Sequence, residues 1–260
     1  MKVNAVDLFC GVGGLTAGLQ QAGINVVAGI DIEAKCKFPY EKNNNAKFIN
    51  ADLKEIQSKY IKDLYPKDTD ITVLAGCAPC QPFSSYSYRY KGSDVTKNKM
   101  DLLDTFSRIV EDIEPDVVSM ENVPQLAKED IFANFIATLK KLNYKVTWNI
   151  VYAPAYGVPQ KRKRLVLLAS KEYNITLISP LFSKENYPTV KDAIFGLPKI
   201  KAGESDARDK MHHSPKLTKI NLERIKQSKP GGTWHDWEDK LILKAYRKKV
   251  ESHIHQYMVE

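Results

Sequence analysis

Two cysteines separated by two residues carry the most reactive side chains in the sequence. Cys77 and Cys80 stand in the run Gly-Cys-Ala-Pro-Cys-Gln-Pro-Phe-Ser at residues 76–84, directly after an apolar run. A thiol at the exit of a buried strand, in a segment stiffened by Pro79 and Pro82, is a typical place for a reactive cysteine. The two cysteines could form a redox or metal-binding pair, or one of them could be a lone nucleophile.

The pair hypotheses need features that the rest of the chain does not offer. A redox Cys-x-x-Cys needs a helix that starts at the first cysteine, and Pro82 disfavours a helix there. A zinc site needs a second pair of ligands at suitable spacing. The remaining sulfur and imidazole pairs stand in other elements or far along the chain: Cys10 and Cys36, His212 and His213. We therefore expect no metal site.

The elements that must position these residues alternate regularly. Apolar runs predict strands at residues 3–9, 26–30, 47–50, 70–75 and 117–120, and helical periodicity predicts helices at 15–22, 33–42, 99–114 and 131–142. Two further strands, 144–153 and 164–170, follow without a helix between them. Such alternation predicts a parallel sheet with right-handed crossovers. The expected fold is α/β, with a mostly parallel seven-stranded sheet and a final antiparallel strand pair.

Polar and reactive residues recur where the predicted strands end. They are Gly11, Asp31, Asp52, Cys80 and Glu121. Ligands of open parallel sheets bind at the carboxyl ends of the strands. The sequence therefore predicts a single site at this edge of the sheet.

The first two strand ends suggest an adenosine-containing cofactor. A Gly-Val-Gly-Gly turn occupies residues 11–14, and Asp31 closes the next strand. A carboxylate there can accept both hydroxyls of a ribose. Thr16 stands where a pyrophosphate-binding motif has its third glycine, so the pattern favours S-adenosylmethionine over NAD. Asp52 fits an acceptor for the adenine amino group.

Composition indicates a globular chain of one large domain, or one domain with an extension. It has 260 residues, of which 43% are hydrophobic. Asp7 interrupts the first apolar run, so we expect no signal peptide, and no apolar run is long enough to span a bilayer. Four cysteines without a secreted disulfide pattern predict reduced thiols and a cytoplasmic protein.

The charge is unevenly distributed along the chain. The net charge of +8 divides into −4 over residues 1–130 and +12 over residues 131–260. A basic half is typical of proteins that bind nucleic acid. A solvated lysine-rich surface would give the same count, and charge alone does not separate the two interpretations.

Four segments resemble, in the same order, motifs of the cytosine-5 methyltransferases, chiefly those that act on DNA. They are Asp-Leu-Phe-Cys-Gly-Val-Gly-Gly at 7–14, Pro-Cys-Gln-Pro-Phe-Ser at 79–84, Glu-Asn-Val at 121–123, and the segment 156–164 with its Gln-x-Arg-x-Arg pattern. The resemblance covers roughly residues 3–200. It implies a Rossmann-like S-adenosylmethionine-dependent methyltransferase fold.

The resemblance also implies catalytic roles. Cys80 matches the nucleophile whose thiolate adds to C6 of a flipped-out cytosine, which leaves Cys77 a packed neighbour. Glu121 matches the acid that acts at N3, and a raised pKa in a closed pocket would keep it protonated. Arg162 and Arg164 match the arginines that hold the base oxygen and neighbouring groups.

Binding roles follow from the same motifs. The implied S-adenosylmethionine contacts are Phe9, Cys10, Gly11, Val12, Gly13, Gly14, Asp31, Ile32, Asp52, Leu53 and Pro79. The implied substrate contacts are Gln81, Ser84, Asn122, Val123 and Gln160. S-adenosylhomocysteine would be the product and no metal is needed. The polar residues 84–99 are a candidate lid over the flipped base.

The motif pattern predicts a division of labour between polypeptides. Residues 1–185 form the expected catalytic domain, and 186–260 the connection toward a target recognition region that is absent in full. The sequence contains no Gly-Asn pair of the late motif. The chain therefore resembles the larger subunit of a split bacterial methylase that acts on double-stranded DNA with a second subunit. A truncated, degenerate or deliberately shortened protein is the alternative.

An apolar stripe marks a helix expected to begin near Asp236. Its members are Ile242, Tyr246, Val250, Ile254 and Met258. Packing on its own domain is slightly favoured over docking of a partner chain. Two other functions are kept as alternatives: methylation of tRNA, and a non-catalytic nucleic-acid-binding role.

Overall fold

The computed structural model describes residues 1–79 and 94–243, with side chains from residue 102 onward in the second range. The chain divides into two compact units, Met1–Ala193 and Ile194–Glu260. The first unit contains the whole sheet. None of the helices in the described part of the chain is long and apolar enough to cross a membrane.

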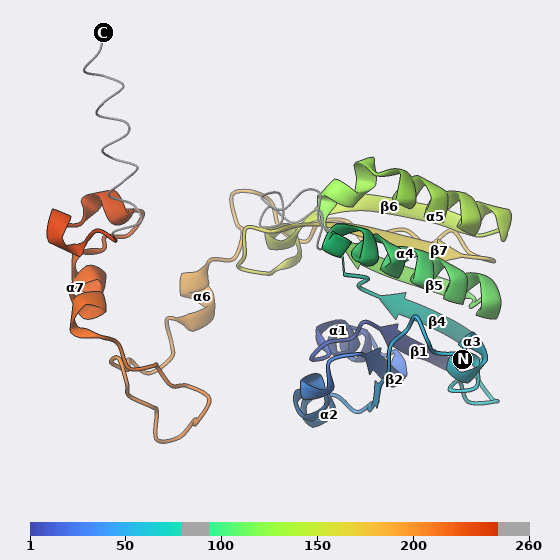
Figure 1. Cartoon of the computed structure of the whole chain (residues 1–260), viewed down its shortest axis with the longest axis horizontal. Coiled ribbons are helices and arrows are strands. Elements are labelled where there is room, and N and C mark those ends of the chain that lie inside the picture. The colour runs from blue at the N-terminus through green and yellow to red at the C-terminus, as the bar shows by residue number, and fades with distance from the viewer. Residues whose placement is uncertain (80–93, 244–260) are drawn as a thin grey trace, which may run out of the picture. The chain divides into compact units, whose positions relative to one another are not determined.

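One seven-stranded sheet organises the first unit (Figure 1). Its strands are β1 (Val3–Leu8), β2 (Asn25–Asp31), β3 (Lys47–Asn50), β4 (Ile71–Gly76), β5 (Val117–Asn122), β6 (Lys145–Tyr152) and β7 (Lys163–Ser170). The strand order is β3-β2-β1-β4-β5-β7-β6, and β7 runs antiparallel to both of its neighbours. The predicted α/β fold with a mostly parallel sheet is confirmed.

The alternation of side chains along β1 separates the two faces of the sheet. Val6 and Leu8 belong to the large apolar cluster that also contains Phe106. Phe106 lies on α4 (Asp94–Ile113), which packs beside α5 (Asp130–Lys141) in Figure 1. Each large apolar side chain buried in this way contributes about 1.5–3 kcal/mol. The long amphipathic helices therefore fix this face of the sheet.

On the other face, two short helices are held by a buried polar chain. They are α1 (Gly14–Gln21) and α2 (Lys37–Asn43). Thr16 of α1 donates its hydroxyl to Asp7 of β1 at 2.7 Å and lies 2.9 Å from the Tyr40 hydroxyl of α2. Gly29 leaves room for the Tyr40 ring, because a Cβ there would lie 2.4 Å from the hydroxyl oxygen.

The helices differ from those expected in three ways: one shifted start, one additional 3₁₀ turn and one additional short helix. α4 begins at Asp94 instead of near residue 99, so the end of the predicted lid is helical, while residues 84–93 lie outside the described residues. A 3₁₀ turn, Ala34–Cys36, precedes α2. α3 (Ser58–Lys62) was not expected. A helical period in the sequence is recognised only where successive turns bury apolar residues. These short or polar turns bury too few apolar residues to give such a period.

The second unit, taken by itself, contains little regular structure. α6 (Val190–Ile194) ends at the first residue of this unit. α7 (Lys219–Gln227) is capped at its N-terminus by Thr218. Two 3₁₀ turns follow, at Trp234–Asp236 and Asp239–Leu241.

A helix that begins near Asp236 is therefore wrong for the described residues. Trp237 is extended, with ψ at 151°, and interrupts any continuous helix. The Arg224 side chain donates to the Leu241 carbonyl at 2.7 Å and holds the second turn against α7. The stripe residues after Ile242 lie outside the described residues.

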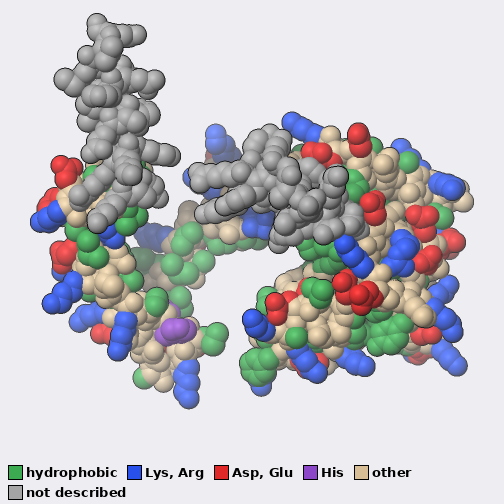
Figure 2. Space-filling view, viewed as in Figure 1, with side chains coloured by type: hydrophobic (Ala, Val, Ile, Leu, Met, Phe, Trp, Pro, Cys, Tyr) green, Lys and Arg blue, Asp and Glu red, His purple; other side chains and the backbone are tan. Residues whose placement is uncertain are grey.

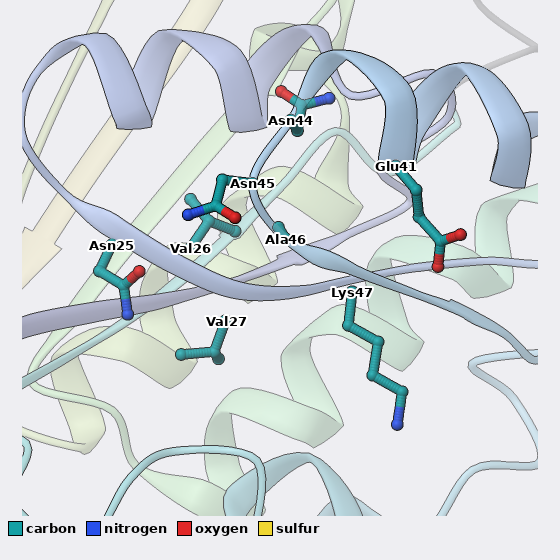
Figure 3. A pocket seen from close by; sticks show the side chains of 8 residues that line it. All are labelled: Asn25, Val26, Val27, Glu41, Asn44, Asn45, Ala46 and Lys47. Carbon is teal, nitrogen blue, oxygen red and sulfur yellow. The ribbon is translucent and has the colours of Figure 1, made fainter.

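A hollow of about 570 Å³ opens near the amino ends of β2 and β3 (Figure 3). Asn25, Asn45 and Lys47 are among the residues that line it. The predicted site residues follow the opposite, carboxyl ends of these strands, so the hollow is not part of that site.

Candidate active site

The register of the sheet gathers the predicted residues at one edge. Leu8 at the end of β1 pairs with Ile30 of β2 and with Gly76 of β4. Gly76 pairs in turn with Met120 of β5. The segments that follow these strands therefore emerge side by side, as the sequence predicts.

Asp31 fixes the turn after β1. Its Oδ2 accepts the Gly11 backbone N–H at 2.9 Å, and its Oδ1 accepts the Glu33 N–H at 2.8 Å. Gly11 has a positive φ of 51°, a conformation that glycine adopts at little cost. Asn50, which the sequence did not single out, donates its side-chain amide to the carbonyls of Asp31 and Ile32. The carboxylate is thus oriented before any ligand arrives.

A cavity of about 310 Å³ lies beside this turn. It is lined by the predicted residues Phe9, Asp31, Ile32, Asp52, Leu53 and Pro79, together with Ala51, Lys54 and Leu102. Ile32 is 67% exposed, so its apolar side chain can cover the face of a planar ring. An apolar wall with two carboxylates suits an adenosine group. Leu102 lies in the helix predicted at residues 99–114, and only the position of that helix in the fold brings it to the cavity.

Five of the residues predicted to bind the cofactor do not line the cavity: Gly11, whose N–H is bound to Asp31, and the four described next. The Cys10 side chain is buried in a cluster with Tyr40 and Phe48. Val12 is exposed, and Gly14 begins α1. Gly13 has φ at 90° and is closely packed, because a Cβ would lie 2.2 Å from the Asn44 side-chain nitrogen. These residues shape the turn, and any contact with a ligand by Cys10 would involve its backbone.

Glu121 and Arg164 form an ion pair at the other half of the edge. Arg164 Nε lies 2.6 Å from Glu121 Oε1. The Arg164 side chain is 20% exposed and the Glu121 side chain 32% exposed, so the pair is largely shielded from solvent but still accessible to a ligand. Arg162, in the segment before β7, is exposed. The antiparallel pairing of β5 with β7 brings these distant residues together.

The environment of Glu121 shifts its pKa upward. Burial raises the pKa of the Glu121 carboxyl, while a hydrogen bond with the Cys77 thiol and the charge of Arg162 lower that pKa in part. Burial and then the Glu121 charge raise the pKa of the Cys77 thiol. Cys77 therefore remains a thiol at neutral pH.

Asn122 acts on the cysteine segment. It is buried, and its side-chain amide donates to the Ala78 carbonyl at 3.0 Å. Its Oδ1 accepts the Val123 N–H at 2.8 Å. Both ends of the amide are thus engaged within the protein, and the side chain holds the backbone before Pro79.

The remaining predicted residues divide into two groups. Gln160 is exposed, and its backbone N–H donates to the Val158 carbonyl. The rest lie outside the described residues: Cys80, Gln81 and Ser84. On the face of the first unit seen in Figure 2, Lys and Arg side chains lie among Asp and Glu side chains. The exposed basic residues 161–163 lie at the start of β7, which begins at Lys163.

A fully buried carboxyl group lies beneath the cofactor half. Burial raises the pKa of Asp7 to about 7, although the Thr16 hydroxyl opposes the shift. Its Oδ1 has no hydrogen-bond partner among the described residues. Sequence reasoning assigned Asp7 no role beyond its place in the first motif. The signal in the sequence that could have indicated a buried carboxyl is the acidic residue within the mostly apolar strand β1.

The fold and the site together define a Rossmann-like methyltransferase. The sequence matches the C-5 cytosine-specific DNA methylase family over residues 3–259, beyond the point near residue 200 where the motifs become sparse. The chain belongs to this family of DNA cytosine-5 methyltransferases.

Individual relatives agree with this assignment. The chain is 44% identical to the Type II methylase M.HgiDII of Herpetosiphon aurantiacus, over 94% of its own length and 68% of the relative's. It is 29% identical to the Type II methyltransferase M1.HphI of Haemophilus parahaemolyticus, over 97% of this chain and 68% of that one. A crystal structure described as a prophage-encoded DNA modification methyltransferase of E. coli matches with a TM-score of 0.64 and 26% identity, over 78% of this chain and 57% of that chain.

Proposed function

We propose that the protein transfers a methyl group from S-adenosylmethionine to C5 of a cytosine in DNA. The observation that carries the proposal is the Glu121–Arg164 ion pair, at 2.6 Å, on the same sheet edge as the adenosine-shaped cavity. A carboxyl paired with a guanidinium offers hydrogen bonds that suit N3 and the exocyclic groups of a cytosine. The Type II methylase relatives support DNA as the substrate.

The chain offers three groups for the cofactor. Asp31 accepts the ribose hydroxyls, Ile32 covers the adenine face, and Asp52 accepts from the adenine amino group. When bound, S-adenosylmethionine supplies an electrophilic methyl group to the base and leaves as S-adenosylhomocysteine.

The chain's own residues carry the chemistry at the base. The Cys80 thiolate forms a bond to C6, and the displaced electron pair makes C5 nucleophilic. Glu121 donates a hydrogen bond or a proton to N3 as negative charge develops there. After methylation, removal of the C5 proton expels the sulfur and restores the thiolate. Arg164 keeps the carboxyl oriented throughout.

The target base has to leave the duplex to reach this edge. A cytosine inside the helix exposes neither C6 nor N3 to a thiol and a carboxyl together, so we propose that the base is flipped out. The exposed basic residues 161–163, beside Arg164, can bind the phosphates of the displaced strand.

We further propose that target recognition needs a second polypeptide. The matched parts of the chain cover 68% of M.HgiDII and 57% of the matched crystal chain, so both relatives contain segments that these 260 residues do not match. The partner is expected to carry the late motifs and the recognition domain. Sequence-specific methylation by the 260 residues alone would contradict this part of the proposal.

The test measures transfer of tritium from labelled S-adenosylmethionine. The substrates are plasmid DNA, the same DNA with 5-methylcytosine, and tRNA, each with and without the product of the neighbouring gene. We expect label in unmodified DNA only, with the largest signal when the second protein is present. Label in tRNA, or in 5-methylcytosine DNA, would contradict the proposed substrate.

A further inference from the structure

Cys77 lies in direct reach of Glu121, a contact that its assignment as a packed neighbour does not explain. Gly76 and Met120 are register partners in the parallel β4–β5 pair, so the next residues, Cys77 and Glu121, lie side by side. Cys77 follows the end of β4, whereas Glu121 continues β5 and pairs with Val166 of β7. The Cys77 backbone N–H donates to the Leu8 carbonyl at 3.3 Å and fixes the cysteine against β1. The register therefore places the Cys77 side chain beside the Glu121 carboxyl, and each group shifts the pKa of the other.

We propose that Cys77 is a positioning residue, whose S–H holds the Glu121 carboxyl in place from the side opposite to Arg164's strand. The residue after β4 supplies the thiol and β7 supplies the guanidinium, and both strands flank β5 in the sheet order. Two donors from two neighbouring strands restrict the rotation of one carboxyl group. The inference rests on the proposed function of Glu121.

The thiol is suited to this position because it remains protonated. A cysteine buried beside a carboxyl group keeps its proton, so it can donate but does not compete with Cys80 as a nucleophile. A thiol is also a weak donor. It therefore orients Glu121 without strongly stabilising the carboxylate. Strong stabilisation would lower the pKa of Glu121 and prevent it from acting as an acid at N3.

Four charged or titratable groups among the described residues govern the balance at this point. Three of them act on Glu121: Arg164 of β7, Arg162 in the segment before β7, and Cys77 directly after β4. Asp7 from β1 acts on Cys77. Because the S–H stabilises the ionised carboxyl, its removal raises the pKa of Glu121. Activity that needs protonated Glu121 is lost as pH rises through the pKa of Glu121. Without the thiol, this loss should occur at a higher pH than in wild type.

The kinetic test compares Cys77→Ala, Cys77→Ser and, as a matched control, Cys36→Ala. For Cys77→Ala we expect kcat to fall about three- to tenfold and the alkaline limb of its pH profile to move up by about half a pH unit. KM values for DNA and S-adenosylmethionine should be unchanged. Cys77→Ser keeps a donor and should restore the wild-type limb. A role in packing alone would change thermal stability but not the limb.

A second measurement does not depend on activity. The infrared S–H stretching band of Cys77 is assigned by its loss in Cys77→Ser, and its frequency is then measured in Glu121→Gln. We expect the band to move to higher frequency, because an amide is a weaker acceptor than a carboxylate.

The outcomes separate the two hypotheses. A band that does not move in Glu121→Gln overturns the contact. A moved band with an unchanged pH limb in Cys77→Ala overturns the positioning role. Wild-type protein that transfers no methyl group, with its partner present, overturns the proposed function and leaves the infrared result to decide the contact.

Discussion

The two halves of the site are built in different ways. In the cofactor half, Asp31 accepts backbone N–H groups from Gly11 and Glu33, so a short stretch of chain around β1 and β2 orients it. In the base half, Glu121 has side-chain neighbours that are distant in the sequence: Arg164 of β7 pairs with it, and Cys77 after β4 acts on its pKa. The cofactor half is local and held by backbone, whereas the base half is assembled by strand pairing.

This difference indicates what each half can tolerate. Backbone donors survive substitution of the residues that carry them, so the cofactor half should respond mainly to changes of Asp31 itself. Side-chain donors do not survive substitution, so the base half should respond to each of its members. Substitutions in one half are expected to leave the other half working.

The largest effect is expected from Glu121→Gln. Loss of the acid at N3 should lower the rate of methyl transfer by about 10²- to 10⁴-fold, with S-adenosylmethionine affinity unchanged. Single-turnover tritium transfer and calorimetric titration measure the two quantities. Glu172→Gln, an exposed carboxyl on the opposite edge of the sheet, is the control. Loss of cofactor affinity in Glu121→Gln would show that the halves are not independent.

The next largest effect is expected from Asp31→Ala. Removal of the acceptor frees the Gly11 turn and removes the ribose contact, so the Kd for S-adenosylmethionine should rise about 10- to 100-fold. At saturating cofactor, methyl transfer should remain close to the wild-type rate. Asp31→Asn, which keeps the shape, should show a smaller loss of affinity. An unchanged Kd in both variants would remove Asp31 from the cofactor site.

A pH-dependent effect is expected from Asp7, beneath the cofactor half. Its pKa of about 7 in the folded protein exceeds the ordinary value of 3.8, so between these pH values the folded state holds a proton that the unfolded state has released. The free energy of unfolding should therefore fall as pH rises from 4 to 7, by up to about 1.4 kcal/mol per pH unit.

Urea unfolding of wild type and Asp7→Asn at several pH values tests this slope. The difference between the two proteins should favour wild type most at low pH and level off above pH 7. A difference that is constant with pH would show that Asp7 does not titrate in this range.

The smallest effect is expected from Tyr40→Phe. The variant loses the hydrogen bond to Thr16, which should cost about 1 kcal/mol of stability. Activity should be unchanged, because the buried chain supports α1 and α2 and not the reacting groups. Tyr60→Phe, an exposed tyrosine, is the control for urea unfolding. A loss of activity would place the buried chain in the site.

The parts that sequence predicts well are those with local signals. The strand periods predict the sheet, and the turn at residues 11–14 followed by Asp31 predicts the cofactor edge. The family motifs implied that Glu121 and Arg164 share one site, but their ion pair was not predicted, since nothing local joins them. The contact of Cys77 with Glu121 and the place of Leu102 in the cavity depend on register and helix position. These are set by packing and have no sequence period.

The helix expected near Asp236 illustrates the opposite failure. An apolar spacing of four predicts a helix face, but Thr233 and Asp236 cap a short turn and the chain becomes extended at Trp237. Capping groups decide where a helix ends, and a hydrophobic period does not detect them.

The central claim is that Cys80 attacks a cytosine held by Glu121 and Arg164. The most direct measurement is covalent capture by a DNA duplex containing 5-fluorocytosine, in the presence of S-adenosylmethionine and the partner protein. Fluorine at C5 cannot leave as a proton does, so the thioether to the base should persist. Wild type should form an adduct that survives denaturing electrophoresis, and Cys80→Ser should form none. An adduct that persists in Cys80→Ser, or none in an active wild-type enzyme, would contradict the account.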